Sequence, residues 1–167
     1  MLITLEELEI HRIVVSKTYA PGDLDYHGAE FRQLKPLRVG AVAERVGSEI
    51  RVRGHLETVL GASCDRCLGP VEIPVERDFD VYYRPLSTIA REEEVEVSED
   101  ELNVGFFSGD GVELADVITE VVILSVPMKL VCGPDCQGLC PVCGANRNVE
   151  ECHCPQPKAD SPFAALK

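Results

Sequence analysis

The chain has 167 residues and a mass of 18.3 kDa, and 45% of its residues are hydrophobic, enough for the core of one ordinary domain. Its formal net charge of −13 repels phosphate backbones, so a nucleic-acid role would need a local basic patch or a protein intermediary. No apolar run approaches the length of a membrane span, which argues against a membrane protein. The first ten residues carry acidic groups where an export signal carries positive charge, so we expect a cytoplasmic protein in a reducing environment.

Local signals near the N-terminus predict a short helix and a strand. Thr4 and Glu7 have the spacing of a capping box, which favours a helix over residues 5–10, with a strand entering a sheet as the alternative. The β-branched residues of segment 12–19 predict a strand. Residues 25–34 are polar and mixed, and we expect a loop or an irregular edge there.

Three longer segments alternate between apolar and polar residues, as half-buried strands do. They cover residues 35–46, 49–60 and 71–83, and the last of them alternates over the greatest length. The turn between the second and third segments carries Cys64 and Cys67. These two cysteines are therefore expected at the tip of a β-hairpin, from which both side chains can project.

The segment that follows the strands combines an acidic run with helical spacing. Residues 91–101 are rich in glutamate and aspartate and are expected to form a solvated loop, and residues 102–107 resemble a short strand. Asp110 and Glu113 form a second capping signature ahead of apolar residues at helical spacing. The pattern predicts an amphipathic helix that ends at Pro127 and covers one face of the sheet.

Together these elements predict an α+β fold with two parts. Residues 1–127 would form a mostly antiparallel β-sheet body with one amphipathic helix. Residues 128–167 would form a cysteine-rich, zinc-binding tail packed on that body.

Cysteines dominate the C-terminal part of the sequence. Six of the eight cysteines lie between residues 132 and 154, and in a reducing compartment such density indicates metal ligands rather than disulfides. Zinc prefers four thiolate or imidazole ligands in a tetrahedron, and a C-x-x-C turn places two sulfurs on one ion. We therefore predict zinc as the cofactor, with all eight cysteines as ligands: Cys64, Cys67, Cys132, Cys136, Cys140, Cys143, Cys152 and Cys154.

The spacing favours one division of these ligands into two sites. The C-x-x-C-G knuckle at 140–144 would share an ion with the cysteines at 152 and 154, across an excursion short enough for a hairpin. The pair at 132 and 136 would then join the hairpin pair at 64 and 67. Exchange of ligand pairs between the sites, and substitution of His153 for Cys154, remain open. A structural thiol pair, a redox dithiol or an iron–sulfur cluster are further alternatives.

The sequence does not favour an enzyme. A catalytic zinc keeps a position open for water and usually has histidine or carboxylate ligands, whereas sulfur is abundant here and the four histidines are scattered. No phosphate-binding glycine loop or serine nucleophile motif is present, and we expect no small-molecule substrate. The first residues to consider for RNA contact are Arg51, Arg53, Arg66 and Arg147, which would matter if they gathered on one side.

Several motifs, in this order, closely resemble the bacterial YceD family, also described as the large ribosomal RNA subunit accumulation protein family. They are CDRCL at 64–68, LSVPMK at 124–129, CQGLCPVCGAN at 136–146, CHC at 152–154 and DSPFAAL at 160–166. The resemblance implies a non-enzymatic role in the synthesis, processing or accumulation of large-subunit ribosomal RNA. It also implies that the tail metal serves folding, because other members keep the hairpin C-x-x-C and lack most tail cysteines.

The expected partner is a ribosomal RNA precursor or a large-subunit ribosomal protein, contacted directly or indirectly. Two other functions fit parts of the sequence. One is a thiol redox or metal-handling protein that uses Cys64 and Cys67. The other is a protein-binding module whose acidic run engages a basic ribosomal protein.

Overall fold

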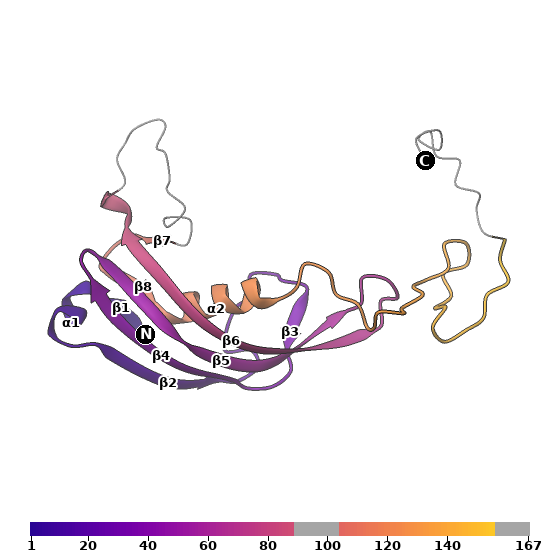
Figure 1. Cartoon of the computed structure of the whole chain (residues 1–167), viewed down its shortest axis with the longest axis horizontal. Helices are drawn as coiled ribbons and strands as arrows, with labels where there is room; N and C mark the ends of the chain where they lie inside the picture. The colour runs from indigo at the N-terminus through magenta and orange to yellow at the C-terminus, as the bar shows by residue number, and fades with distance from the viewer. Residues whose placement is uncertain (89–103, 156–167) are drawn as a thin grey trace, which may run out of the picture. The chain divides into compact units, whose positions relative to one another are not determined.

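A computed structural model of the chain describes residues 1–88 and 104–155, and these residues form two compact units (Figure 1). The sheet unit comprises residues 1–61 and 72–127. The cysteine unit comprises residues 62–71 together with the chain from residue 128 onward. The acidic run at 91–101 and the DSPFAAL motif lie outside the described residues.

A six-stranded sheet forms most of the sheet unit. Its strands lie in the order β2-β4-β5-β6-β7, and β3 pairs with β5 off this path. β2–β4 and β4–β5 are antiparallel, whereas β6 and β7 run parallel. The bounds of these strands are Ile13–Tyr19 for β2, Phe31–Gln33 for β3, Leu37–Val46 for β4, Glu49–Ser63 for β5, Pro70–Pro85 for β6 and Val104–Phe107 for β7. A short 3-10 helix, Leu86–Thr88, follows β6.

The alternation of the long strands places one face of the sheet in the core, as predicted. The large apolar residues of β4 and β5 on this face are completely or almost completely buried. Burial of each such side chain contributes about 1.5–3 kcal/mol of transfer free energy. They are Leu37, Val39, Ile50, Val52, Leu56 and Leu60. The opposite face of the same strands carries most of their charged residues.

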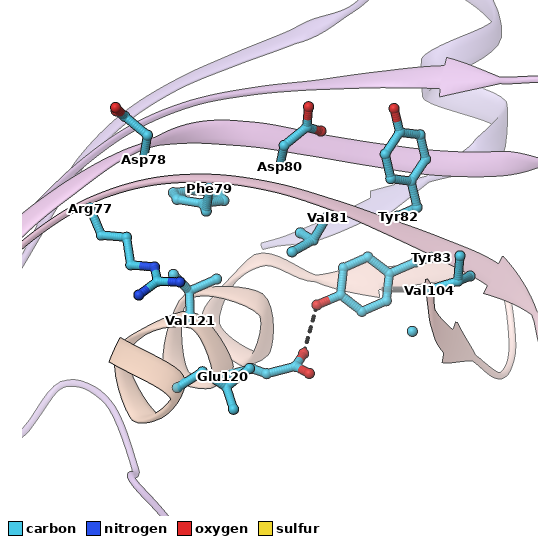
Figure 2. A pocket seen from close by; sticks show the side chains of 12 residues that line it. Arg77, Asp78, Phe79, Asp80, Val81, Tyr82, Tyr83, Val104, Glu120 and Val121 are labelled. Carbon is cyan, nitrogen blue, oxygen red and sulfur yellow. Dashed lines mark hydrogen bonds between the residues drawn. The ribbon is translucent and has the colours of Figure 1, made fainter. Parts of the chain in front are cut away.

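Helix α2, Leu114–Ser125, packs its apolar stripe into this core. The helix ends where Pro127 follows, since proline cannot donate the next backbone hydrogen bond. At its polar margin, Tyr83 of β6 donates a hydrogen bond of 2.8 Å to the carboxylate of Glu120, beside a cavity of about 360 Å³ (Figure 2). Burial, together with the neighbouring Glu120, raises the pKa of Tyr83, so the phenol stays protonated and keeps donating.

The predicted N-terminal helix is confirmed. Helix α1, Leu5–Ile10, begins at a capping box in which the backbone N–H of Glu7 donates to Thr4 Oγ1 at 3.2 Å. Within residues 1–88 and 104–155 the structure thus has two α-helices, and the second is the amphipathic helix predicted for the body.

The predicted capping signature before α2 was wrong. Gly111–Glu113 is strand β8, which pairs antiparallel with β1, Leu2–Thr4. Glu113 is the N-cap residue of α2, and its side chain makes no capping hydrogen bond. Glycine is needed in this pair, because a Cβ at Gly111 would lie 2.0 Å from the carbonyl oxygen of Ile3. The parallel pairing of β6 with β7 was also not predicted.

Neither helix within the described residues is both long and apolar enough to span a membrane.

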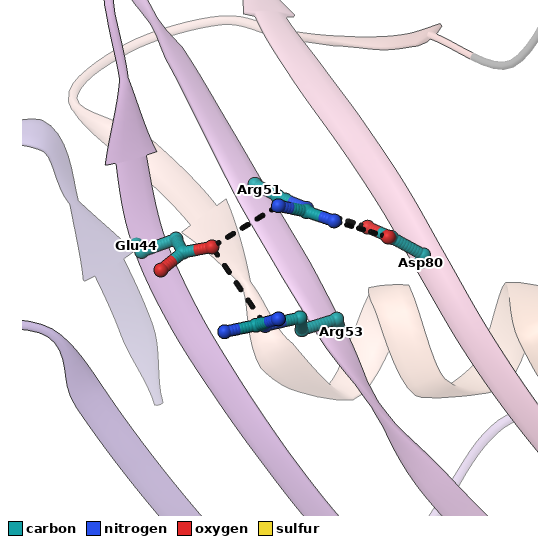
Figure 3. A network of polar contacts seen from close by, with 4 residues as sticks. All are labelled: Glu44, Arg51, Arg53 and Asp80. Atoms are coloured by element: carbon teal, nitrogen blue, oxygen red, sulfur yellow. Dashed lines mark hydrogen bonds and ion pairs between the residues drawn. The ribbon is translucent and has the colours of Figure 1, made fainter.

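Ion pairs cross three strands on the polar face of the sheet (Figure 3). Arg51 makes two hydrogen bonds to the carboxylate of Asp80, at 2.8 and 2.5 Å, and a third of 3.3 Å to Glu44. Arg53 lies 3.7 Å from the same oxygen of Glu44. The two guanidinium groups are thus matched by two carboxylates from β4 and β6. The hydrogen bond from Arg51 lowers the pKa of Asp80.

We expect Gly54→Ala to destabilise the sheet unit. Gly54 is paired with Ala41, and a Cβ at position 54 would lie 2.3 Å from the carbonyl oxygen of Gly40 and 2.8 Å from the Cα of Ala41. Such overpacking costs about 1–3 kcal/mol, which a shifted urea denaturation midpoint would reveal. Gly40→Ala is the matched control, since a Cβ there meets nothing within 4 Å. Equal midpoints for the two variants would contradict this packing.

We expect Asp80→Asn to lower stability at pH 7 by at most about 1 kcal/mol, because the ion pair is partly exposed. The folded-state pKa of Asp80 lies below its unfolded value, so the contribution is present above about pH 3.9 and is lost as pH falls through the folded-state pKa. Unfolding free energies of wild type and variant should therefore converge in acid. Glu76→Gln, an exposed change on the same strand, is the control. A difference that persists at low pH would refute the ion-pair account.

Candidate metal centres

The hairpin tip that carries the first two cysteines is a tight turn between β5 and β6. Backbone hydrogen bonds close it, from Cys64 N to the carbonyl of Gly69 at 2.7 Å and from Leu68 N to the carbonyl of Cys64 at 2.9 Å. Leu68 takes a left-handed conformation with φ of 58°, which turns the chain back toward β6. The turn leaves the sulfurs of Cys64 and Cys67 buried rather than pointing into solvent.

Paired backbone contacts bring the chain after α2 against this tip. Asp65 N donates to the carbonyl of Leu130 at 2.8 Å, and Leu130 N donates to the carboxylate of Asp65 at 2.6 Å. Further on, Leu139 N donates to the carbonyl of Arg66 at 3.1 Å, and the guanidinium of Arg66 donates to the carbonyl of Cys136 at 3.1 Å. These contacts fix two more cysteines beside the first two.

The first group of four sulfurs, site 1, consists of Cys64, Cys67, Cys132 and Cys136, whose Sγ atoms all lie within 4.8 Å of one another. The Sγ separation is 3.8 Å for Cys64 and Cys136 and 3.6 Å for Cys67 and Cys132. Thiolates about 2.3 Å from a central zinc ion, at tetrahedral angles, would be about 3.8 Å apart. Disulfide sulfurs are separated by only about 2.05 Å, so these cysteines are free thiols.

The second group, site 2, consists of Cys140, Cys143, Cys152 and Cys154. Its first two ligands lie on a knuckle closed by a hydrogen bond of 2.9 Å from Gly144 N to the carbonyl of Cys140, and Gly144 has a φ of 74°, which glycine adopts without strain. Cys152 Sγ lies 3.3 Å from Cys140 Sγ and 3.4 Å from Cys143 Sγ.

Backbone amides stabilise thiolates in site 1. Burial opposes ionisation of Cys64, but hydrogen bonds from the amides of Cys67, Arg66 and Cys132 outweigh it and lower its pKa to about 6. Hydrogen bonding to Cys136 and Cys67 instead raises the pKa of Cys132 to about 12. Without a metal, the group therefore shares protons among its sulfurs. A divalent ion that binds all four sulfurs displaces the remaining protons.

Site 2 has the same division between ionised and protonated sulfurs. Amide hydrogen bonds from Cys143 and Val142, the latter at 3.4 Å from the sulfur, lower the pKa of Cys140 to about 6. Hydrogen bonding to Cys152 and Cys143 raises the pKa of Cys154 to about 12. Each site thus has at least one sulfur that is ready to bind a cation at neutral pH.

The two sites differ in their access to solvent. Three of the four cysteines in site 1 are buried, and Val71 and Val131 pack against them. In site 2 only Cys140 is buried, and Cys143 is exposed. Both groups supply four protein sulfurs and can each hold a metal ion, with no position left for a reacting water.

The grouping of the eight cysteines is the one that their spacing favoured, and His153 belongs to neither group. The spacing gave no indication of Asn148. Its side-chain amide donates to Cys136 Sγ at 3.4 Å, although residue 148 lies in the excursion between the ligands of site 2. A polar residue in a short loop has no sequence signature that identifies the sulfur it will contact.

The four arginines predicted for RNA contact are divided between the two units. Arg51 and Arg53 belong to the sheet unit and face carboxylates, whereas Arg66 and Arg147 belong to the cysteine unit. Arg66 donates to a backbone carbonyl, and the backbone N–H of Arg147 donates to the carbonyl of Gly138 at 3.0 Å. A role for them in RNA contact stays a prediction.

Comparison of the sequence with protein families and with curated proteins finds related chains. A profile described as "Large ribosomal RNA subunit accumulation protein YceD" matches residues 52–167. A Zea mays protein named "Large ribosomal RNA subunit accumulation protein YCED homolog 1, chloroplastic" is 28% identical over 164 residues, which cover 81% of this chain and 53% of the relative. An uncharacterised protein of Mycobacterium tuberculosis is 36% identical over 118 residues, which cover 70% of this chain and 52% of the relative.

An Arabidopsis thaliana protein with the same name as the maize relative is 22% identical over 160 residues, covering 78% of this chain and 47% of its own length. The chain thus spans about half the length of the curated relatives it matches. No solved structure matches the chain. The profile match includes both cysteine groups, most of β5 and all of β6, β7 and α2, and the chain therefore belongs to the YceD family of large ribosomal RNA subunit accumulation proteins.

Proposed function

We propose that the protein is a non-enzymatic, cytoplasmic accessory factor in the synthesis, processing or accumulation of large-subunit ribosomal RNA. The observation that carries this proposal is the family match over residues 52–167. The names of the maize and Arabidopsis relatives support it, since both refer to accumulation of large-subunit ribosomal RNA. The four-sulfur sites support a role without catalysis, because a catalytic metal needs an open position.

We assign zinc to both cysteine sites. Sulfur separations of 3.3–3.8 Å suit a tetrahedron of thiolates around zinc, and hard cations such as Ca²⁺ and Mg²⁺ require oxygen ligands. The buried core of the cysteine unit around site 1 contains three cysteines and little apolar surface beyond Val71 and Val131. Such a segment needs metal binding to supply its folding free energy. Zinc is thus structural in this proposal.

The charge of the loaded protein favours a protein partner over direct contact with RNA. Four thiolates around one divalent ion carry a net charge of −2, so two filled sites take the formal charge from −13 to about −17. Arg51 and Arg53, two of the candidate RNA contacts, are already matched by Glu44 and Asp80. A strongly acidic protein fits a basic large-subunit ribosomal protein better than it fits the RNA itself.

A thiol redox function for Cys64 and Cys67 receives less support. Thiol exchange needs an accessible thiolate, but the two residues are 0% and 6% exposed. The lowered pKa of Cys64 serves metal binding equally well, since the ligand form of cysteine is the thiolate.

The purified protein should contain two zinc ions per chain by elemental analysis. Cys64→Ser with Cys67→Ser should leave one ion, and Cys140→Ser with Cys143→Ser should also leave one, because each pair supplies half of one site. His153→Ala is the matched control and should retain both ions, since His153 belongs to neither group. A wild-type protein free of metal, with a C-terminal segment that stays folded in strong chelator, would overturn the zinc assignment.

Depletion of the protein from its host cell should lower mature large-subunit ribosomal RNA relative to small-subunit RNA, as measured by quantitative RNA blotting. Re-expression of the wild-type chain should restore the ratio. Re-expression of the Cys64→Ser, Cys67→Ser variant should not, because loss of site 1 removes the ion that holds the hairpin tip against the chain after α2. An unchanged ratio after complete depletion would exclude the proposed function.

A further inference from the structure

The side chain of Asn148 connects the two cysteine sites. Asn148 lies in the loop of residues 144–151, between the knuckle of site 2 and the last two ligands of that site. Its amide nitrogen nevertheless donates to the sulfur of Cys136, a ligand of site 1, at 3.4 Å. A loop that belongs to one site therefore supplies a hydrogen-bond donor to the other.

The orientation of the Asn148 amide is determined by all of its partners. Its Oδ1 accepts from the backbone N–H of Gln137 at 2.8 Å, so the oxygen cannot exchange places with the nitrogen. One hydrogen of Nδ2 points to Asn146 Oδ1 at 2.9 Å, and the other points to Cys136 Sγ. Both side-chain donors and the acceptor are thus used, and the contact with sulfur is built into the loop.

Site 2 holds this loop in place. The excursion starts at Cys143 and returns at Cys152, two ligands whose sulfurs are 3.4 Å apart. Between them, Arg147 N donates to the carbonyl of Gly138 at 3.0 Å, and Leu139 forms an isolated bridge with Asn146. Further backbone hydrogen bonds, from Cys140 N to the carbonyl of Ala145 at 2.8 Å and from Glu150 N to the carbonyl of Asn146 at 2.9 Å, are also local to this loop and its knuckle. An ion that ties the two ends of the loop together therefore restricts where Asn148 can lie.

A donor to a metal-bound thiolate has a predictable effect. The thiolate carries negative charge, and an N–H that donates to it forms a charge-assisted hydrogen bond, which stabilises the deprotonated form of the sulfur that binds the ion. Removal of such an outer contact typically costs 10–100-fold in metal affinity. Because site 1 is largely buried and site 2 is more exposed, a chelator reaches site 2 first.

We propose that Asn148 couples the two metal sites, so that an ion in site 2 slows the loss of the ion from site 1. The inference rests on the zinc assignment of the proposed function and goes beyond it by making the two sites cooperative. Coupling between binding equilibria is reciprocal, so an ion in site 1 also raises affinity at site 2. Release of metal is then ordered, with site 2 opening first and site 1 following because its donor is withdrawn.

The test uses the full chain loaded with ¹¹³Cd²⁺, because each four-sulfur site then gives its own NMR signal. Signals are assigned from the variants that lack one ligand pair. On addition of excess EDTA, the site 1 signal of wild type should outlast the site 2 signal. In Asn148→Ala the site 1 signal should decay about tenfold faster. Val149→Ala, a change in the same loop at a side chain that is 79% exposed, should decay as wild type does.

A double-mutant cycle shows whether the effect of site 2 passes through Asn148. Cys152→Ser with Cys154→Ser removes the ion of site 2 and should speed the decay of site 1 about as much as Asn148→Ala does. Combining all three changes should add little further. A wild-type rate in Asn148→Ala, or factors that multiply in the combined variant, would overturn the coupling. A chain that binds no metal would overturn the zinc assignment as well, whereas two tightly held ions that are lost independently would overturn the coupling alone.

Discussion

The cysteine unit depends on bringing thiols from distant parts of the sequence within a few ångström of each other. Cys64 and Cys136 are 72 residues apart in the chain, yet their sulfurs are 3.8 Å apart. Hydrophobic burial alone contributes little here, because two apolar neighbours from the described residues, Val71 and Val131, pack against the buried cluster around these sulfurs. Hydrogen bonds such as the pair between Asp65 and Leu130 position the cysteines, and closely spaced thiolates would repel one another unless protons or a cation offset their charge.

The sheet unit is held together by hydrophobic burial, and its sequence pattern predicts its long strands more directly. Long alternating strands such as β5 and β6 could be predicted because a period of two over many residues has no other common explanation. The pair formed by β1 and β8 could not be predicted, because each strand has three residues and carries no periodicity. Gly111 lies between Asp110 and Glu113, the residues of the predicted capping signature, and its lack of a side chain instead allows close strand pairing.

For the candidate metal sites, sequence spacing predicted the two groups of cysteines but not their surroundings. Eight cysteines in pairs can be counted, and the excursion from Cys143 to Cys152 is short enough to suggest a shared ion. The donors to sulfur come from backbone amides and from Asn148, and their positions depend on the three-dimensional course of the turns. Likewise, the carboxylate partners of Arg51 follow from cross-strand register, which a single sequence does not specify.

The path of the chain through site 1 has a consequence for the whole protein. Residues 64 and 132 enclose the whole of the sheet unit from residue 72 onward, together with all of β6 and α2. A cross-link that closes a loop of this length removes conformational entropy from the unfolded chain, equivalent to about 4 kcal/mol at room temperature in the loop-closure model. An ion held at site 1 would therefore act on the unfolding equilibrium of the sheet through chain connectivity. Site 2 encloses only its own short loop, so an ion there would not act on the unfolding equilibrium of the sheet in this way.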